Sequence, residues 1–289
     1  MVKAEVALAA GALVGEGPVW SVEERALYWV DVPAGTVHRF EPGTGATRSW
    51  QLPAEVGCIA LRSSGGAIAA LRTGLCLVDF ETGEVEALFD PEAHQPRTRF
   101  NDGKCDRQGR LWAGTMDIDE KEPLGALYCF SGGRGYERML SAVGMSNGLG
   151  WSPDDRTMYH TDSLTRVISA YDYDSDTGAL GAARPFVCDR LPAVPDGLAV
   201  DAGGCVWSVK WDAWRVVRYT PDGRVDREIS LPVQQPTSCA FGGSDLDVLF
   251  VTSAREGLSA AALTEQPLAG SVFAVEVGAQ GLPQPLYRG

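Results

Sequence analysis

Four oxygen-bearing side chains recur at one position of a repeated phrase, and they are the residues best suited to chemistry. The phrase occurs six times along the 289-residue chain, and four copies begin with Glu16, Asn101, Asn147 or Asp196. Carboxylate and amide oxygens are hard ligands that suit Ca²⁺, Mg²⁺ and Mn²⁺ and are tolerated by Zn²⁺. Any single Asn-Gly or Asp-Gly pair favours a simple turn. Brought together, the set indicates a site for one divalent ion with positions left for water and substrate.

The spacing of the phrase predicts the fold that would bring these side chains together. The six copies begin at positions 16, 57, 101, 147, 196 and 237, so they are 41 to 49 residues apart. Each is followed by a turn and two β-rich runs, such as Ala26–Val30 and Val37–Phe40 in the first repeat. A period of about 40 to 50 residues with three or four short strands is typical of a β-propeller blade. We therefore predict an all-β, six-bladed β-propeller.

Equivalent positions of different blades face the same central channel, so the first residues of the six phrases should form a ring. The ring positions are Glu16, Gly57, Asn101, Asn147, Asp196 and Thr237. Arg99 lies two residues before Asn101, and its guanidinium could hold an oxygen-rich substrate by paired hydrogen bonds. A plain surface arginine is an equally open reading of that position.

Composition narrows the classes of partner. The net charge of −13 and the pI of about 4.7 oppose nucleic acid and anionic membrane surfaces. No apolar run approaches the roughly 20 residues that span a bilayer. Seven cysteines without a CxxC motif are typical of reduced thiols, so we expect a cytoplasmic protein. We expect one domain over residues 1–289 and a monomer, with Ala4–Val14 as a strand that closes the ring beside the last blade.

Three other matches to known motifs have weaker support. Ser146 lies in a GxSxG pattern, but that motif needs a strand-to-helix turn, whereas here it leads into a propeller strand. Asp172–Asp176 resembles the start of an EF-hand loop, yet Thr177 and Ala183 replace the Gly and Glu that such a loop requires. The three histidines have no metal-binding spacing, and we interpret His160 as a strand residue.

Several segments together resemble one known family. They are Gly15–Trp20, Arg99–Lys104, Ala113–Met116, Ser146–Leu149, Pro195–Gly197 and Thr237–Gly243. In these motifs the chain is similar to the regucalcin (senescence marker protein)/gluconolactonase family of six-bladed propellers. The likeness extends over nearly the whole chain, down to Gln266–Gly270.

The resemblance implies a sugar-lactone hydrolase with a divalent metal, which would be Ca²⁺, Zn²⁺, Mn²⁺ or Mg²⁺. Glu16, Asn147 and Asp196 would hold the metal, and Arg99 and Asn101 would place the substrate. The family also has an acidic substrate contact after the Gly-Thr-Met motif. Here Asp119 would supply that contact, although segment 117–125 is shorter than the regucalcin lid.

These expectations lead to a mechanism and to its competitors. Hydrolysis of a lactone develops negative charge on the carbonyl oxygen, which a divalent ion stabilises as a Lewis acid. Asp196 would act as general base on the attacking water, and the product would be the open aldonic acid. A non-catalytic calcium-binding or scaffold propeller would use the same ring. Hydrolysis of phosphoesters or organophosphates follows the same Lewis-acid logic.

Overall fold

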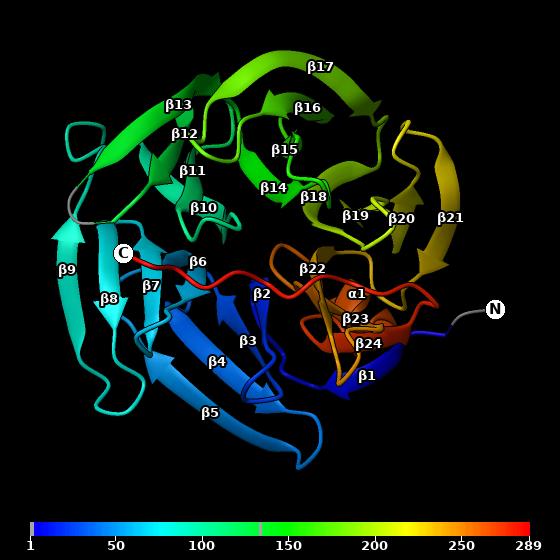
Figure 1. The fold of residues 1–289 in the computed structure, drawn as a ribbon. Helices are drawn as coiled ribbons and strands as arrows, with labels where there is room; N and C mark the ends of the chain where they lie inside the picture. Colours follow the sequence, from blue (N-terminus) through cyan, green and yellow to red (C-terminus); the bar gives the residue numbers. More distant parts are fainter. Residues whose placement is uncertain (1–2, 133–134) are drawn as a thin grey trace.

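Six four-stranded antiparallel sheets surround a central axis, as Figure 1 shows, which confirms the predicted all-β six-bladed propeller. The computed structural model describes residues 3–132 and 135–289. Its only helix in these ranges is α1 (Ala260–Glu265), capped at its start by the side chain of Ser259. In the part of the chain that the structure describes, no helix is long and apolar enough to cross a membrane.

In each blade the strands follow one another from the channel outward. The first consists of β2 (Gly15–Ser21), β3 (Ala26–Asp31), β4 (Thr36–Glu41) and β5 (Ala46–Gln51). The second consists of β6 (Val56–Leu61), β7 (Ala67–Leu71), β8 (Gly74–Val78) and β9 (Val85–Phe89). The third consists of β10 (Thr98–Cys105), β11 (Leu111–Asp117), β12 (Gly125–Phe130) and β13 (Tyr136–Val143).

The remaining blades follow the same order, except that the last takes its outer strand from the N-terminal segment. The fourth consists of β14 (Ser146–Trp151), β15 (Thr157–Asp162), β16 (Val167–Tyr173) and β17 (Leu180–Cys188). The fifth consists of β18 (Val194–Val200), β19 (Val206–Trp211), β20 (Arg215–Tyr219) and β21 (Val225–Ser230). The sixth consists of β22 (Pro236–Gly242), β23 (Val248–Ser253), β24 (Val272–Glu276) and β1 (Glu5–Leu8).

Burial falls from the channel outward, which explains why the inner strands are easier to find in the sequence. Strands β2, β6, β14 and β22 are buried along nearly their whole length, whereas β5 buries only Trp50. The Trp50 indole donates a hydrogen bond to the Phe80 carbonyl oxygen, 3.0 Å away, and so joins the first blade to the second. The outer strands need few apolar residues because one face meets solvent.

The ring of blades closes through the N-terminal segment, as predicted. Strand β1 pairs antiparallel with β24, with Glu5 opposite Ala274 and Leu8 opposite Val272. The strand itself is shorter than the predicted Ala4–Val14 and ends at Leu8. This pairing fastens one end of the chain to the last blade and leaves no gap in the circle of sheets.

Every innermost strand has an irregularity in its pairing at or just after the ring position. In β2 the register shifts between Glu16 and Val19, and in β14 it shifts between Asn147 and Leu149. The innermost strands of the other four blades shift at the corresponding place. Such bulges bend a strand and redirect a side chain. The repeated irregularity therefore coincides with the residues that face the mouth of the channel.

The last residues cross the far end of the channel, and we call residues 279–289 the C-terminal strap. In Figure 1 this red segment runs across the centre of the ring. Its backbone and side chains bond to several blades, through Gly281 N to Leu246 O (2.8 Å), Trp20 N to Gln284 Oε1 (2.6 Å), Tyr287 N to Leu61 O (2.8 Å) and Arg288 N to Gly109 O (3.1 Å). These partners lie beyond the ring positions along the chain, so the strap covers the end of the channel opposite the ring.

Candidate functional site

A cavity of about 580 Å³ opens at the end of the channel where the innermost strands begin. All six residues that the sequence singled out for the site line it, namely Glu16, Arg99, Asn101, Asp119, Asn147 and Asp196. They come from four innermost strands and from the segment after β11. Residues separated by up to 180 positions in the chain are thus brought to one place, as the propeller geometry predicts.

Two ring positions contribute no side chain to this cavity, and the structure gives a reason for each. At Gly57 a Cβ atom would lie 2.6 Å from the Phe100 carbonyl oxygen, so a larger residue cannot fit there. The Thr237 hydroxyl is buried, donates to the Gly15 carbonyl oxygen at 2.5 Å and lies 2.8 Å from the Thr252 hydroxyl. At these two positions the ring residues pack against a neighbouring blade. The polar side chains in the cavity therefore come from the other four ring positions.

The orientation of Asn147 is set by hydrogen bonds on both sides of its amide. Its Nδ2 donates to Ser163 Oγ at 2.9 Å, and Ser163 in turn donates to the Pro195 carbonyl oxygen at 2.6 Å. Its Oδ1 accepts a hydrogen bond from Asn101 Nδ2 at 3.2 Å. The amide oxygen is therefore held in a fixed direction. Ser163 follows the second strand of its blade, so the repeated phrase gave no signal for it.

Arg99 and Asn101 act as a connected pair at the wall of the cavity. Arg99 Nη1 donates to Asn101 Oδ1 at 2.9 Å and to the Phe100 carbonyl oxygen at 3.0 Å. Burial lowers the pKa of the Arg99 guanidinium, while nearby glutamates, including Glu55 and Glu120, raise it. A guanidinium carries five N–H donors. Both of these bonds use Nη1, so the N–H groups on Nε and Nη2 of Arg99 are available to a ligand in the cavity.

Two buried carboxylates line the cavity. Glu16 and Asp196 are each 8% exposed. Burial raises the pKa of both carboxyls, and the charge of Asp196 further raises that of Glu16. Asp102, one residue beyond the ring, adds to the repulsion felt by both. Glu16 Oε2 accepts a hydrogen bond from the Gly17 amide at 2.6 Å, which favours its charged form.

This donor set fits a hard divalent cation. Two carboxylates repel one another in a buried place, and a cation between them would remove the repulsion. The third donor, Asn147, is neutral. Among the described residues, no group of three or more His, Cys, Asp or Glu side chains is arranged to hold a metal. The candidate site thus depends on an amide oxygen as its third donor.

Asp119 lies at the rim of the cavity, on a loop anchored by a different aspartate. Its side chain is 54% exposed, and its Oδ2 lies 3.9 Å from Arg97 Nη2. The fully buried Asp117 accepts hydrogen bonds from the backbone amides of Asp119 (3.3 Å), Lys121 (3.2 Å) and Glu122 (3.1 Å). These bonds fold residues 117–122 into a tight turn beside the cavity. The sequence analysis did not identify Asp117.

Further wall residues also escaped the sequence analysis. They include Glu55, Arg72, Glu120, Trp211, Asp212 and Glu256. Trp211 ends β19, and the others follow the second strand of a blade or lie in a connecting loop, where no repeated position marks them. Of the charged residues in the wall, seven are acidic, and Arg72 and Arg99 are the two cations.

The motif matches with weaker support lie elsewhere. Ser146 begins β14 and is fully buried, and its Oγ lies 2.9 Å from His160 Nε2. A Cβ on Gly114 would lie 1.8 Å from that oxygen, so the hydroxyl is packed between blades and does not line the cavity. Burial lowers the pKa of His160 to about 4. Asp174 accepts bonds from the amides of Asp176 and Thr177 in the β16–β17 turn, as expected for a hairpin.

Comparison with known proteins places this geometry in a family. Residues 14–255 match the family model described as SMP-30/Gluconolactonase/LRE-like region. The chain is 42% identical to 6-deoxy-6-sulfogluconolactonase of Pseudomonas putida over 96% of both chains. It is 36% identical to regucalcin of Oryctolagus cuniculus over 100% of this chain and 99% of that one.

A solved structure agrees with these matches. The calcium-binding protein regucalcin from Agrobacterium tumefaciens superposes with a TM-score of 0.95 at 29% identity, covering 99% of this chain and 98% of that one. The family model extends from the first blade through β23 of the sixth, and the relatives and this solved structure each cover 96% or more of the chain. The chain belongs to the SMP-30/gluconolactonase/regucalcin family.

Proposed function

We propose that this protein is a divalent-metal-dependent hydrolase that opens sugar lactones to aldonic acids. The observation that carries the proposal is the convergence of Glu16, Asn147 and Asp196 at the base of one cavity, with Arg99 and Asn101 on its wall. The 42% identity to a sulfogluconolactonase over nearly the whole chain supports a sugar lactone as substrate. The cavity of about 580 Å³ has room for a six-membered lactone.

In this proposal Glu16, Asn147 and Asp196 hold the ion. A divalent ion bound there supplies Lewis acidity for the lactone carbonyl and lowers the pKa of bound water. The side chains of the protein orient the groups that bind and react. The hydrogen bonds from Asn101 and to Ser163 keep the Asn147 oxygen directed for binding without reorganisation. Such preorganisation is a large contributor to electrostatic catalysis.

Asp196 is the proposed general base. Its carboxylate takes a proton from the attacking water as the new carbon–oxygen bond forms, and the proton then leaves with the ring oxygen as the lactone opens. Burial and the charge of Asp102 raise its pKa, which opposes the lowering that a bound cation would cause. Arg99 and Asn101 hold ring hydroxyls, and Asp119 contacts the substrate from the rim.

One competing function has an observation in its favour. The solved structure with a TM-score of 0.95 is a calcium-binding protein, so a non-catalytic calcium-binding propeller would explain the same ring. The two functions differ in what they require of the cavity. A pure binder needs only the ion, whereas an enzyme also needs Arg99 and the rim to engage a polyol.

A panel of aldonolactones, with and without an anionic group at carbon 6, tests the proposal directly. Acid release would be followed at constant pH with Ca²⁺, Mg²⁺, Mn²⁺ or Zn²⁺ added to chelator-treated protein. We expect turnover of at least one lactone well above its spontaneous hydrolysis, and only with a metal present. Metal binding without turnover of any lactone would instead support the calcium-binding function.

We also propose that the protein works as a monomer in a reducing compartment such as the cytoplasm. The seven cysteines are all free in the structure, and six of them are buried. Buried free thiols act as small apolar side chains and need no oxidising environment. Sedimentation of the purified protein would test the monomer.

A further inference from the structure

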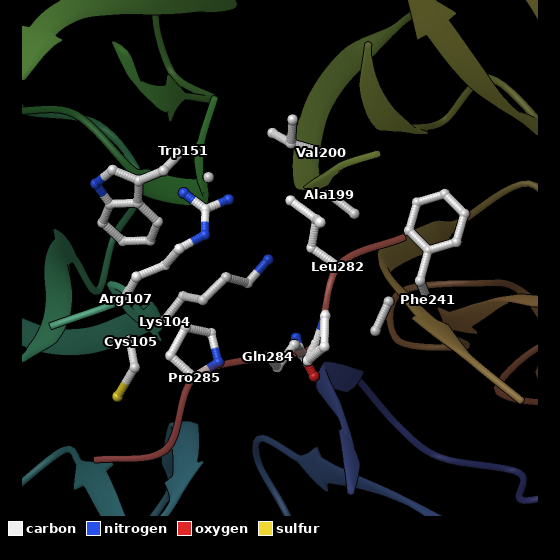
Figure 2. A pocket seen from close by; sticks show the side chains of 13 residues that line it. Lys104, Cys105, Arg107, Trp151, Ala199, Val200, Phe241, Leu282, Gln284 and Pro285 are labelled. Carbon is white, nitrogen blue, oxygen red and sulfur yellow. The ribbon is translucent and has the colours of Figure 1, made fainter. Parts of the chain in front are cut away.

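The ammonium group of Lys104 lies inside the channel below the ring. Lys104 belongs to β10, three residues after Asn101, and Figure 2 shows its side chain extending into the space that the C-terminal strap encloses. Its Nζ donates a hydrogen bond to the Leu198 carbonyl oxygen at 2.8 Å. This bond fixes the charged end of the side chain near the axis, between the ring and the strap.

Asp102 shares this part of the channel with Lys104. Both line one small cavity of about 20 Å³, together with Gly17 and Gln284. Asp102 is 6% exposed, and its Oδ1 accepts a hydrogen bond from the Gly103 amide at 2.7 Å. The channel below the ring thus contains a carboxylate and an ammonium, neither of which belongs to the proposed ligand set.

These charges lie next to the ring. Gly17, which follows Glu16, lines the same small cavity as Lys104 and Asp102, and Leu198, which accepts the Lys104 hydrogen bond, lies two residues after Asp196. With a cation bound, ionised Glu16, Asp102 and Asp196 would carry three negative charges, and Lys104 would carry one positive charge. The balance is two negative charges, which one divalent ion would neutralise.

Apolar residues dominate the strap side of the channel. A second cavity of about 70 Å³ beside Lys104 is walled by apolar residues such as Val200, Phe241 and Leu282. Arg107 also faces it, as Figure 2 shows, but Arg107 is paired with Asp155 and bonds to the Ser152 carbonyl oxygen at 3.0 Å. The carboxylates toward the ring are therefore the groups that Lys104 balances.

We propose that Lys104 is an internal countercharge that adjusts the ring to bind a divalent ion and to disfavour a trivalent one. The proposal deepens the proposed function and rests on its metal site. A fixed charge close to a bound ion in a medium of low dielectric changes ion affinity strongly. Its effect grows with the charge of the ion, so losing Lys104 should favour trivalent ions most. A purely structural role would depend on the bond to Leu198 and not on charge.

Charge-changing variants separate these two roles. Lys104→Gln removes the charge but keeps an N–H donor, and Asp102→Asn removes one opposing charge. The double variant restores the original balance and also covers the case in which Lys104→Gln alone fails to fold. Arg224→Gln is a matched control, because it makes the same change in net charge at a side chain that is 83% exposed.

The measurement is the dissociation constant of Ca²⁺ and of Tb³⁺ from chelator-treated protein, by calorimetry and by terbium luminescence sensitised through Trp211, which lines the cavity. We expect Lys104→Gln to bind Ca²⁺ on the order of tenfold more tightly, with a larger gain for Tb³⁺. Asp102→Asn should bind both ions more weakly. The double variant and Arg224→Gln should resemble the wild type.

Unchanged affinities in Lys104→Gln, or a double variant that does not return toward the wild type, would overturn the countercharge while leaving the metal site intact. If the wild-type protein bound neither ion, the metal-dependent function itself would fail, and the countercharge with it. The two failures are therefore distinguishable.

Discussion

The side-chain amide of Asn101 donates a hydrogen bond to Oδ1 of Asn147, 3.2 Å away, and so links the innermost strands of the third and fourth blades. The same amide also donates to the Ser146 carbonyl oxygen at 3.0 Å. A residue assigned to the substrate thus also orients an oxygen assigned to the metal. Metal binding and substrate binding are expected to be linked through this pair.

Replacing Asn101 with alanine tests that link. The change removes both of these hydrogen bonds and the one that Asn101 Oδ1 accepts from Arg99, each of which typically contributes about 0.5–1.5 kcal/mol. We expect metal affinity to fall several-fold and kcat to fall with it, measured by calorimetry and by acid release. A variant with normal metal affinity and only a raised KM would show that Asn101 serves the substrate alone.

The charge of Glu16 should be needed to hold the ion. Glu16→Gln keeps the shape and one oxygen but removes the negative charge, so metal affinity should drop. A ligand at a hundred times its Kd stabilises a protein by about 2.7 kcal/mol, and this gain should shrink in the variant. Thermal unfolding with and without Ca²⁺ measures it. Chelation should abolish lactonase activity, and full activity in metal-free protein would contradict the assignment.

Arg99 should affect the substrate more than the metal. Arg99→Ala removes the donors that face the cavity, so KM should rise and kcat/KM should fall. Its bond to Asn101 predicts only a small loss of metal affinity. Arg99→Lys keeps the charge without the planar guanidinium, so its kcat/KM should lie between those of the wild type and Arg99→Ala. Equal losses of metal affinity and turnover would point to a structural role instead.

Asp196 has two proposed roles, and one substitution separates them. Asp196→Asn keeps an oxygen for the ion but removes the basic oxygen, so metal occupancy should survive better than turnover. General bases contribute about 10²- to 10⁴-fold to rate, which sets the expected loss in kcat. Near-normal turnover in the metal-loaded variant would exclude Asp196 as the base. Asp119 would then be the next candidate, tested by Asp119→Asn.

The ring was predictable from sequence because one position per repeat corresponds to one place in every blade. The spacing of Glu16, Asn101, Asn147 and Asp196 reflects the propeller, and all four line the cavity. Ser163 was not predictable in this way. It lies just after a second strand, and it contacts the site through hydrogen bonds with Asn147 and with the Pro195 carbonyl oxygen.

Other features were missed because they lack an apolar repeat. The outer strands, such as β5, are mostly exposed and polar, so periodicity does not mark them. Helix α1 is an insertion in the sixth blade, and the described residues of the other blades contain no counterpart. Asp117 orders the rim loop through backbone amides, whose direction depends on the folded turn.

The C-terminal strap has a kinetic consequence. Leu282–Pro285 lie across the far end of the channel, so in the proposed reaction the product would leave by the mouth through which the lactone enters. A newly formed aldonate must vacate the cavity before the next lactone can occupy it. Added aldonate should therefore raise the apparent KM and leave kcat unchanged. The architecture of the floor thus predicts competitive inhibition by the product, and the rate of a working enzyme would depend on how quickly the acid is removed from its surroundings.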